Sequence, residues 1–188
     1  YGRNSTGGLI NLYTYSPLDY QNTIAKISYG SRNDVRLGLA HYQKIAPRLG
    51  LHVAGNYYSN DGFFRNIYTG KKADDLQSAN AKVGLAWQAA PLWAMRLNVL
   101  FDHSTQGGYP YGLYHADDNT AEAVNYNRYS SYRRNVLSAG MNWLYKGEAF
   151  HFNAQTSFQH SKDKQYIDQD FMPRDLFFTI TGLKQTLV

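Results

Sequence analysis

Apolar and polar residues alternate along most of this chain with a period of two. The clearest segment is 93–102, where Trp93, Leu97 and Phe101 share one parity and polar residues such as Asn98 take the other. This alternation is typical of β-strands with one apolar face, and the 3.6-residue spacing of amphipathic helices is nearly missing. The pattern predicts strands near 24–29, 35–40, 49–57, 80–88, 93–102, 134–145, 150–159 and from about 178 onward. We therefore expect an all-β fold.

Charged residues within these segments take the parity opposite to the apolar residues. They are Lys26, Arg36, Lys82, Arg96, Asp102 and Arg134. A soluble β-sandwich also alternates, with its apolar face turned inward. Alternation alone therefore leaves a sandwich and a membrane barrel open.

The rhythm of the connections favours the barrel. Short connections lie at 46–48, 90–92 and 146–148, and longer ones follow Asn60, Gln106 and His160, with 31–33 as a short exception. Aromatic residues gather at the strand ends, and several segments exceed the roughly 5–6 residues of strands in globular sheets. Outer-membrane barrels combine short turns at one end, long loops at the other and aromatic girdles. We expect an antiparallel transmembrane β-barrel with its apolar face toward lipid and its charged face toward the lumen.

Composition excludes several other classes of protein. The 188 residues include 17 tyrosines, 9 phenylalanines and no cysteine, so a disulfide scaffold or thiolate metal site is ruled out. The net charge of +5 is scattered, which gives nucleic-acid binding little support. No apolar run approaches the roughly 18 residues of a membrane-spanning helix. Motifs of hydrolases and phosphate-binding loops are missing, and the acidic loop residues near 74–75 and 115–118 read as solvated. We expect no enzyme activity, no cofactor and no metal site.

The first residues carry the most distinctive string, YGRNSTGGLINLYT. Its glycines bracket a polar turn that leads into a short alternating segment. The string resembles the end of the plug domain of TonB-dependent outer-membrane receptors, and Asn60-Asp61-Gly62-Phe63 resembles a motif of their siderophore-receptor members. The plug-like positions are Tyr1, Gly2, Arg3, Asn4, Gly7 and Gly8.

The resemblance implies a plugged barrel of about 22 strands. Residues 1–19 would form the C-terminal end of the plug and a linker, and 20–188 about the first eight strands. It implies active uptake of a scarce ligand across the bacterial outer membrane, with an iron-siderophore complex favoured over cobalamin or a glycan. The partners would be outer-membrane lipid and the inner-membrane protein TonB, reached through a plug segment outside this sequence. A small closed barrel acting as an adhesin or structural protein, and a soluble β-sandwich binding module, remain the alternatives.

Recognition of such a ligand would fall to the long connections. Aromatic rings with a few cations suit a flat, anionic ferric chelate through stacking and cation–π contacts. The candidate ligand-binding residues are Phe63, Phe64, Arg65, Tyr109, Tyr111 and Tyr114. The cations of the charged parity would attract an anionic substrate or, as the favoured role, pair with acids of the plug.

Overall fold

One antiparallel sheet makes up nearly all of the structure. The computed structural model describes residues 14–187. The sheet has eight strands in the order β1-β2-β3-β4-β5-β8-β9-β10, and a separate pair, β6 and β7, lies in a connection. The strands are β1 (Asn22–Gly30), β2 (Asp34–Ala46), β3 (Leu49–Asn60), β4 (Leu76–Ala90), β5 (Trp93–Gly107), β6 (Tyr114–His115), β7 (Thr120–Ala121), β8 (Ser131–Lys146), β9 (His151–Asp168) and β10 (Phe178–Leu187). The predicted all-β fold is confirmed.

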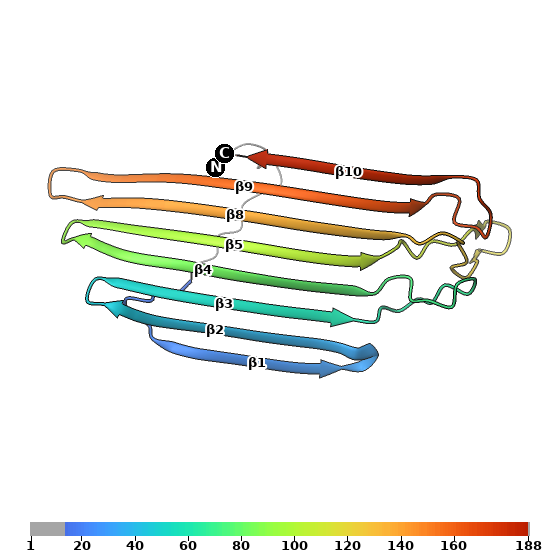
Figure 1. Ribbon diagram of the computed structural model, residues 1–188, viewed down its shortest axis with the longest axis horizontal. Coiled ribbons are helices and arrows are strands. Elements are labelled where there is room, and N and C mark those ends of the chain that lie inside the picture. Colours follow the sequence, from blue (N-terminus) through green and yellow to red (C-terminus); the bar gives the residue numbers. More distant parts are fainter. Residues whose placement is uncertain (1–13, 188) are drawn as a thin grey trace.

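Every strand of the large sheet pairs with its neighbour in the sequence, so the sheet is a meander (Figure 1). Short turns join β2 to β3, β4 to β5 and β8 to β9 at one end of the sheet. Longer connections at 61–75, 108–130 and 169–177 gather at the opposite end, called here the loop end. The exception at the loop end is the turn Ser31–Asn33, a single 3-10 turn. Arg32 and Asn33 adopt positive φ angles of 61° and 52°, which tightens the reversal.

The seventh strand was predicted to end near His160, and this prediction is wrong. β9 continues to Asp168, pairing Lys164 with Arg133 of β8 and with Gly182 of β10. The charged residues Lys162 and Lys164 interrupt the apolar parity there, so the alternation fades while the backbone ladder continues. The connection after β9 is therefore only 169–177.

The two faces of the sheet differ in chemistry. The apolar face carries, for example, Trp93, Leu97 and Phe101 of β5, and the polar face carries Arg96 and Asn98 of the same strand. Apolar-face side chains remain exposed, among them Ile27 at 82%. The buried hydrophobic residues among those described are Ala73, Ala86, Val124 and Tyr126. The strands thus pack almost no core of their own.

Two edges of the sheet stay open. Within residues 14–187, β1 and β10 each pair with one strand, so these eight strands do not close into a ring. No second large sheet covers the apolar face in the described residues, as a sandwich would require. In the same residues, no helix is both long and apolar enough to span a bilayer.

Candidate functional site

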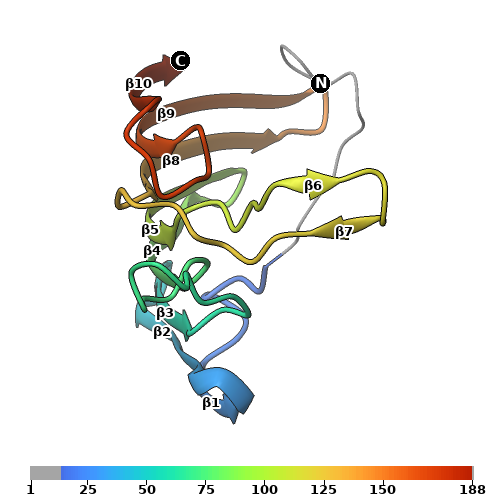
Figure 2. The ribbon, with the colours of Figure 1, turned by 90° about the vertical axis from the view of Figure 1, so that its right-hand side faces the viewer.

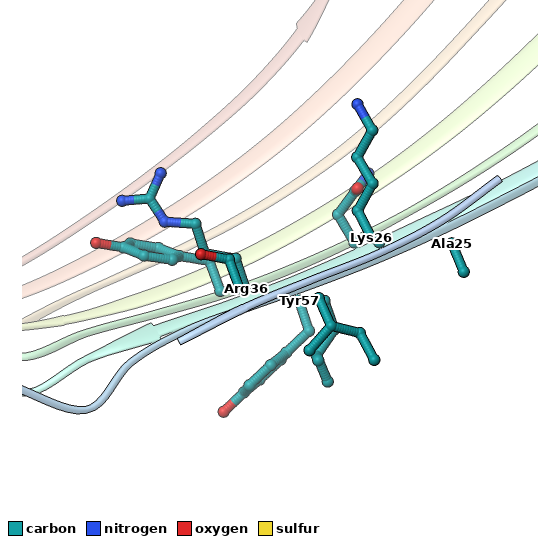
Figure 3. Close-up of a pocket in the computed structure, with 10 residues that line it drawn as sticks. Ala25, Lys26, Arg36 and Tyr57 are labelled. Atoms are coloured by element: carbon teal, nitrogen blue, oxygen red, sulfur yellow. The ribbon is translucent and has the colours of Figure 1, made fainter. Parts of the chain in front are cut away.

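The six charged residues singled out in the sequence share the polar face. The cross-strand register aligns Lys26 with Gly38, Asn56, Asn80 and Asp102 in one row. Figure 3 shows Lys26 and Arg36 on one side of the sheet, with Ala25 and Tyr57 on the other. Since residues of both faces line this hollow, it is the open edge at β1 rather than an enclosed cavity.

Two carboxylates make the polar face of the sheet, called here the wall, less positive than the sequence predicted. Asp34 accepts hydrogen bonds from Arg36 Nε at 2.8 Å, from Tyr58 at 3.2 Å and from Asn60 at 3.1 Å. Arg36 also lies over the ring of Tyr58, 4.9 Å from its centroid. Asp163 of β9 faces Arg134, with Nε and Oδ1 3.4 Å apart. Asp163 was not among the predicted residues because the seventh strand was predicted to end near His160. Asp34 was not among them either, although it shares the parity of Arg36.

Lys26, Lys82 and Arg96 keep their charge available on the polar face. Within residues 14–187, no acidic side chain forms an ion pair with any of the three. An amide contact between Asn56 and Asn80, 3.0 Å long, lies in the row between Lys26 and Asp102. The wall therefore offers isolated cations separated by amide groups, which can meet acidic groups of whatever lies against it.

The segment before β1 docks on the polar face near the short-turn end. A Cβ added at Gly50 would lie 2.7 Å from the backbone of Pro17, so the turn around Ser16–Leu18 rests directly on the strand there. His52 lies across Gly84 of the next strand, where an added Cβ would come within 2.0 Å of its ring. Tyr42 stacks on His52 with ring centroids 5.5 Å apart. Gly50 thus makes room for this segment, and Gly84 makes room for the His52 ring beside it.

The Asp61-Gly62-Phe63 motif holds two connections together at the loop end. Asp61 accepts a 2.7 Å hydrogen bond from Asn33 and pairs with Lys72. Gly62 has a φ of 75°, and the Asp74 carboxylate next to it accepts the backbone N–H of Phe63. These contacts explain the motif as a structural clasp between the β1–β2 turn and the 61–75 connection.

The predicted ligand-binding residues of the 61–75 connection take separate positions. Phe63 remains 68% exposed and lies under the guanidinium of Arg32, 4.4 Å from its ring centroid. Phe64 is exposed, and its N–H donates to Asp74 at 2.8 Å. Arg65 donates to the carbonyl of Gly70 at 2.6 Å. Of the three, Phe63 and Phe64 present open rings.

Tyr109 and Tyr111 belong to an aromatic stack at the loop end. Their rings are nearly parallel with centroids 6.1 Å apart, and Phe171 meets Tyr111 edge-on at 5.1 Å. Gln165, a polar-face residue of β9, donates to the Tyr109 hydroxyl. The stack of Tyr109, Tyr111 and Phe171, called here the aromatic stack, therefore lies above the polar face. Phe171 was not predicted because no motif in the sequence marks it.

Tyr114 lies apart from this stack. It belongs to the β6–β7 pair, which projects sideways from the sheet at the loop end (Figure 2). Its hydroxyl donates to Asn119 at 2.7 Å, and its ring is 63% exposed. The structure thus brings two of the six candidate residues together and leaves the other four distributed over two connections.

A small core orders the connections. Ala73, Val124 and Tyr126 are buried together, and Asn66, only 1% exposed, donates to the carbonyl of Tyr126 at 2.7 Å. Burial raises the pKa of the Tyr126 hydroxyl above its ordinary value. Since Asn66 and Tyr126 come from different connections, the loop end is a packed structure and not a set of independent loops.

No protein-family model matches the chain. The plug-like positions Tyr1, Gly2, Arg3, Asn4, Gly7 and Gly8 lie outside the described residues, as does most of the short alternating segment that follows them. Within residues 14–187, no cluster of three or more histidine or acidic side chains is arranged to hold a metal ion.

Acid is expected to open the clasp. Hydrogen bonds from Lys72 and then Asn33 hold the pKa of Asp61 below the ordinary aspartate value of 3.8. A carboxyl with a lowered folded-state pKa stabilises the fold at pH values above its ordinary pKa, and that contribution is lost as pH falls through the lowered pKa.

Cleavage by pepsin at Phe63–Phe64 should therefore increase on acidification below about pH 4. Asp61→Asn should be cleaved faster than wild type at the upper end of the pepsin range, with the two converging at lower pH. Equal cleavage throughout would contradict the clasp.

Proposed function

We propose that this chain forms part of the wall of a plugged outer-membrane β-barrel, a TonB-dependent receptor that takes up an iron-siderophore complex. The observation that carries the proposal is the apolar face. On β5 it runs from Trp93 to Phe101, nine residues whose eight steps of about 3.4 Å span roughly 27 Å. Nine residues lie within the roughly 9–11 that a tilted transmembrane strand needs.

The same band recurs on the neighbouring strands. No charged side chain lies on the apolar face within 49–57, 79–87, 93–101 or 137–145. Aromatic residues border the band toward the short turns, where Trp93 and Tyr145 lie 4.8 Å apart. Tyr29, Tyr57 and Phe101 border it toward the loop end. Amphipathic rings at both borders suit the two lipid–water interfaces.

Contact between the polar face and a plug is supported by the segment that already lies there. Residues 14–18 reach the wall at Gly50 and His52 and approach Arg96 and Asn98. These residues directly follow the plug-like string. The unpaired cations Lys26, Lys82 and Arg96 are then suited to acids of a plug, and the open edges β1 and β10 to further strands of the barrel.

Under this proposal, the ligand binds from the loop end, above the polar face. The aromatic stack offers flat surfaces for an aromatic chelate. TonB then pulls the plug from the periplasmic side and opens a path along the polar face. The chain's own contribution is the wall, the linker contact and part of the ligand-binding loops.

The class and the substrate are tested separately with the full-length protein. We expect it to fractionate with the outer membrane, to migrate differently on gels before and after heating, and to increase under iron starvation. A protein that stays in solution without detergent would rule out the membrane class. Expression that follows cobalamin or a glycan instead of iron would overturn the substrate alone.

Removing the aromatic stack should weaken ligand binding. For Tyr109→Ala/Tyr111→Ala in the full-length protein, we expect roughly tenfold weaker binding of a ferric catecholate siderophore, corresponding to about 1.4 kcal/mol of lost aromatic contact. Fluorescence quenching would measure the Kd. Tyr129→Ala is the matched control, because Tyr129 is 70% exposed and lies outside the stack. Unchanged binding in the double variant would remove the stack from the ligand site.

A further inference from the structure

Four cations gather on the apolar face toward its loop end. They are Arg133 of β8, Lys162 and Lys164 of β9, and Lys184 of β10, called here the outer basic cluster. On β9 they follow Phe158 and His160 on the same face, and Tyr166 lies on that face between the cluster and the loop end. All four side chains are exposed.

The register places these like charges directly opposite one another. Lys162 is the cross-strand partner of Lys184, and Arg133 is the partner of Lys164. Directly opposite residues have Cβ atoms only about 5 Å apart, and like charges in that position destabilise a sheet. An anion bound between two such pairs would offset their repulsion.

The described part of the chain supplies no such anion. None of the four cations forms an ion pair within residues 14–187. Asp163 lies between Lys162 and Lys164 in sequence, but it points to the polar face and meets Arg134. Lys164 instead lies over the ring of Tyr166, 4.9 Å from its centroid, and Tyr166 stacks with Phe178. Cations beside amphipathic rings at the end of an apolar band are the composition of a membrane interface.

The cluster is also confined to one place. No other lysine or arginine in the strands of the large sheet lies on the apolar face, within the residues that the structure describes. The rest of that face is apolar or neutral from β1 to β5. The concentration on three adjacent strands distinguishes a site from a general excess of positive charge.

We propose that the outer basic cluster binds the phosphate groups of anionic lipid headgroups in the leaflet at the loop end. This inference rests on the proposed membrane location of the apolar face. One phosphate can bridge two of the opposed cations, and a lipid with more than one phosphate can engage all four. The acyl chains of the same lipid then lie along the apolar band below.

The test compares lipids and variants in the full-length protein. Native mass spectrometry of the detergent-solubilised protein measures retention of phosphatidylglycerol against phosphatidylcholine, with inorganic phosphate as competitor. We expect wild type to prefer phosphatidylglycerol, and K162Q/K164Q/K184Q to lose roughly tenfold or more of that preference. K44Q/K71Q/K146Q removes the same charge from exposed lysines outside the cluster and should keep it within about twofold. The single variant K184Q should show a smaller loss, and heat-modifiable migration reports whether each variant is folded.

The outcomes separate the inference from the proposed function. If the protein enters detergent micelles and the triple variant keeps the preference of wild type, the lipid site is wrong while the membrane location stands. The same holds if inorganic phosphate displaces the lipid at low concentration, which would indicate a site for the free ion. If the protein is soluble without detergent and retains neither lipid, the proposed function fails together with the site.

Discussion

Ala139→Arg should prevent accumulation of the full-length protein in the outer membrane. Ala139 lies on the apolar face of β8, opposite Val99 of β5 and Phe158 of β9. If the apolar face contacts lipid, as proposed, an arginine near the middle of the band costs about 2–4 kcal/mol, a large fraction of the stability of a typical domain. Quantitative gels of outer-membrane fractions, with and without heating, would measure the folded amount.

The control for this variant is the adjacent residue. Ser138→Arg introduces the same side chain one position earlier, on the polar face opposite Leu100 and Gln159. An arginine there meets a polar wall, so the folded protein should accumulate nearly as wild type. If both variants accumulate equally, the apolar face does not contact lipid. In a soluble protein the apolar face would be exposed to water, where an arginine is tolerated. The Ala139→Arg variant would then accumulate at least as well as wild type.

Gly84→Ala should detach the segment 14–18 from the wall. The new methyl group would lie 2.0 Å from the His52 ring, which therefore has to move away from the position where it stacks on Tyr42. Overpacking of this kind costs about 1–3 kcal/mol. Faster hydrogen exchange in residues 14–21, and faster proteolysis of the linker, are the expected results in the full-length protein.

The sheet offers a matched control for that change. Gly140 lies on the polar face of β8, and an added Cβ there would come no closer than 4.0 Å to Thr156 O. Gly140→Ala should therefore leave exchange in the linker unchanged. The double variant His52→Ala/Gly84→Ala should recover part of the protection, because the smaller side chain restores the space. An unchanged linker in Gly84→Ala would show that this contact does not hold the segment in place.

Particular elements show where sequence reasoning succeeded. The strand at 93–102 was recognisable because five apolar residues alternate without interruption, and β5 indeed covers Trp93–Gly107. The short turns at Pro47 and Pro91 were marked by residues that cannot continue a ladder. β9 was ended too early because its cations at Lys162 and Lys164 break the apolar parity. That same break marks the outer basic cluster, which becomes apparent only with the register in hand.

The candidate loop residues show the limit of such reasoning. The sequence identified aromatic side chains in the connections as candidates for ligand binding. Which of them contact one another depends on how the connections fold. Tyr111 meets Phe171 across 60 positions of sequence, while Tyr114, only three positions away, lies on a separate hairpin. The Asp61-Gly62-Phe63 string is apparent in the sequence, but its partners are not. Asn33 lies in the β1–β2 turn, and Lys72 and Asp74 lie in the connection after β3.

The sequence by itself determined that the chain forms strands with one apolar and one charged face. Successive side chains point to opposite faces of any strand. The face that a residue takes therefore follows from its position in the strand, whichever strand it pairs with. Only the tertiary structure decided which residues oppose one another, that Gly50 admits the segment 14–18, and that both edges of the eight-stranded sheet stay open among the described residues. Those features depend on register and on contacts between distant segments, which are fixed when the whole sheet assembles.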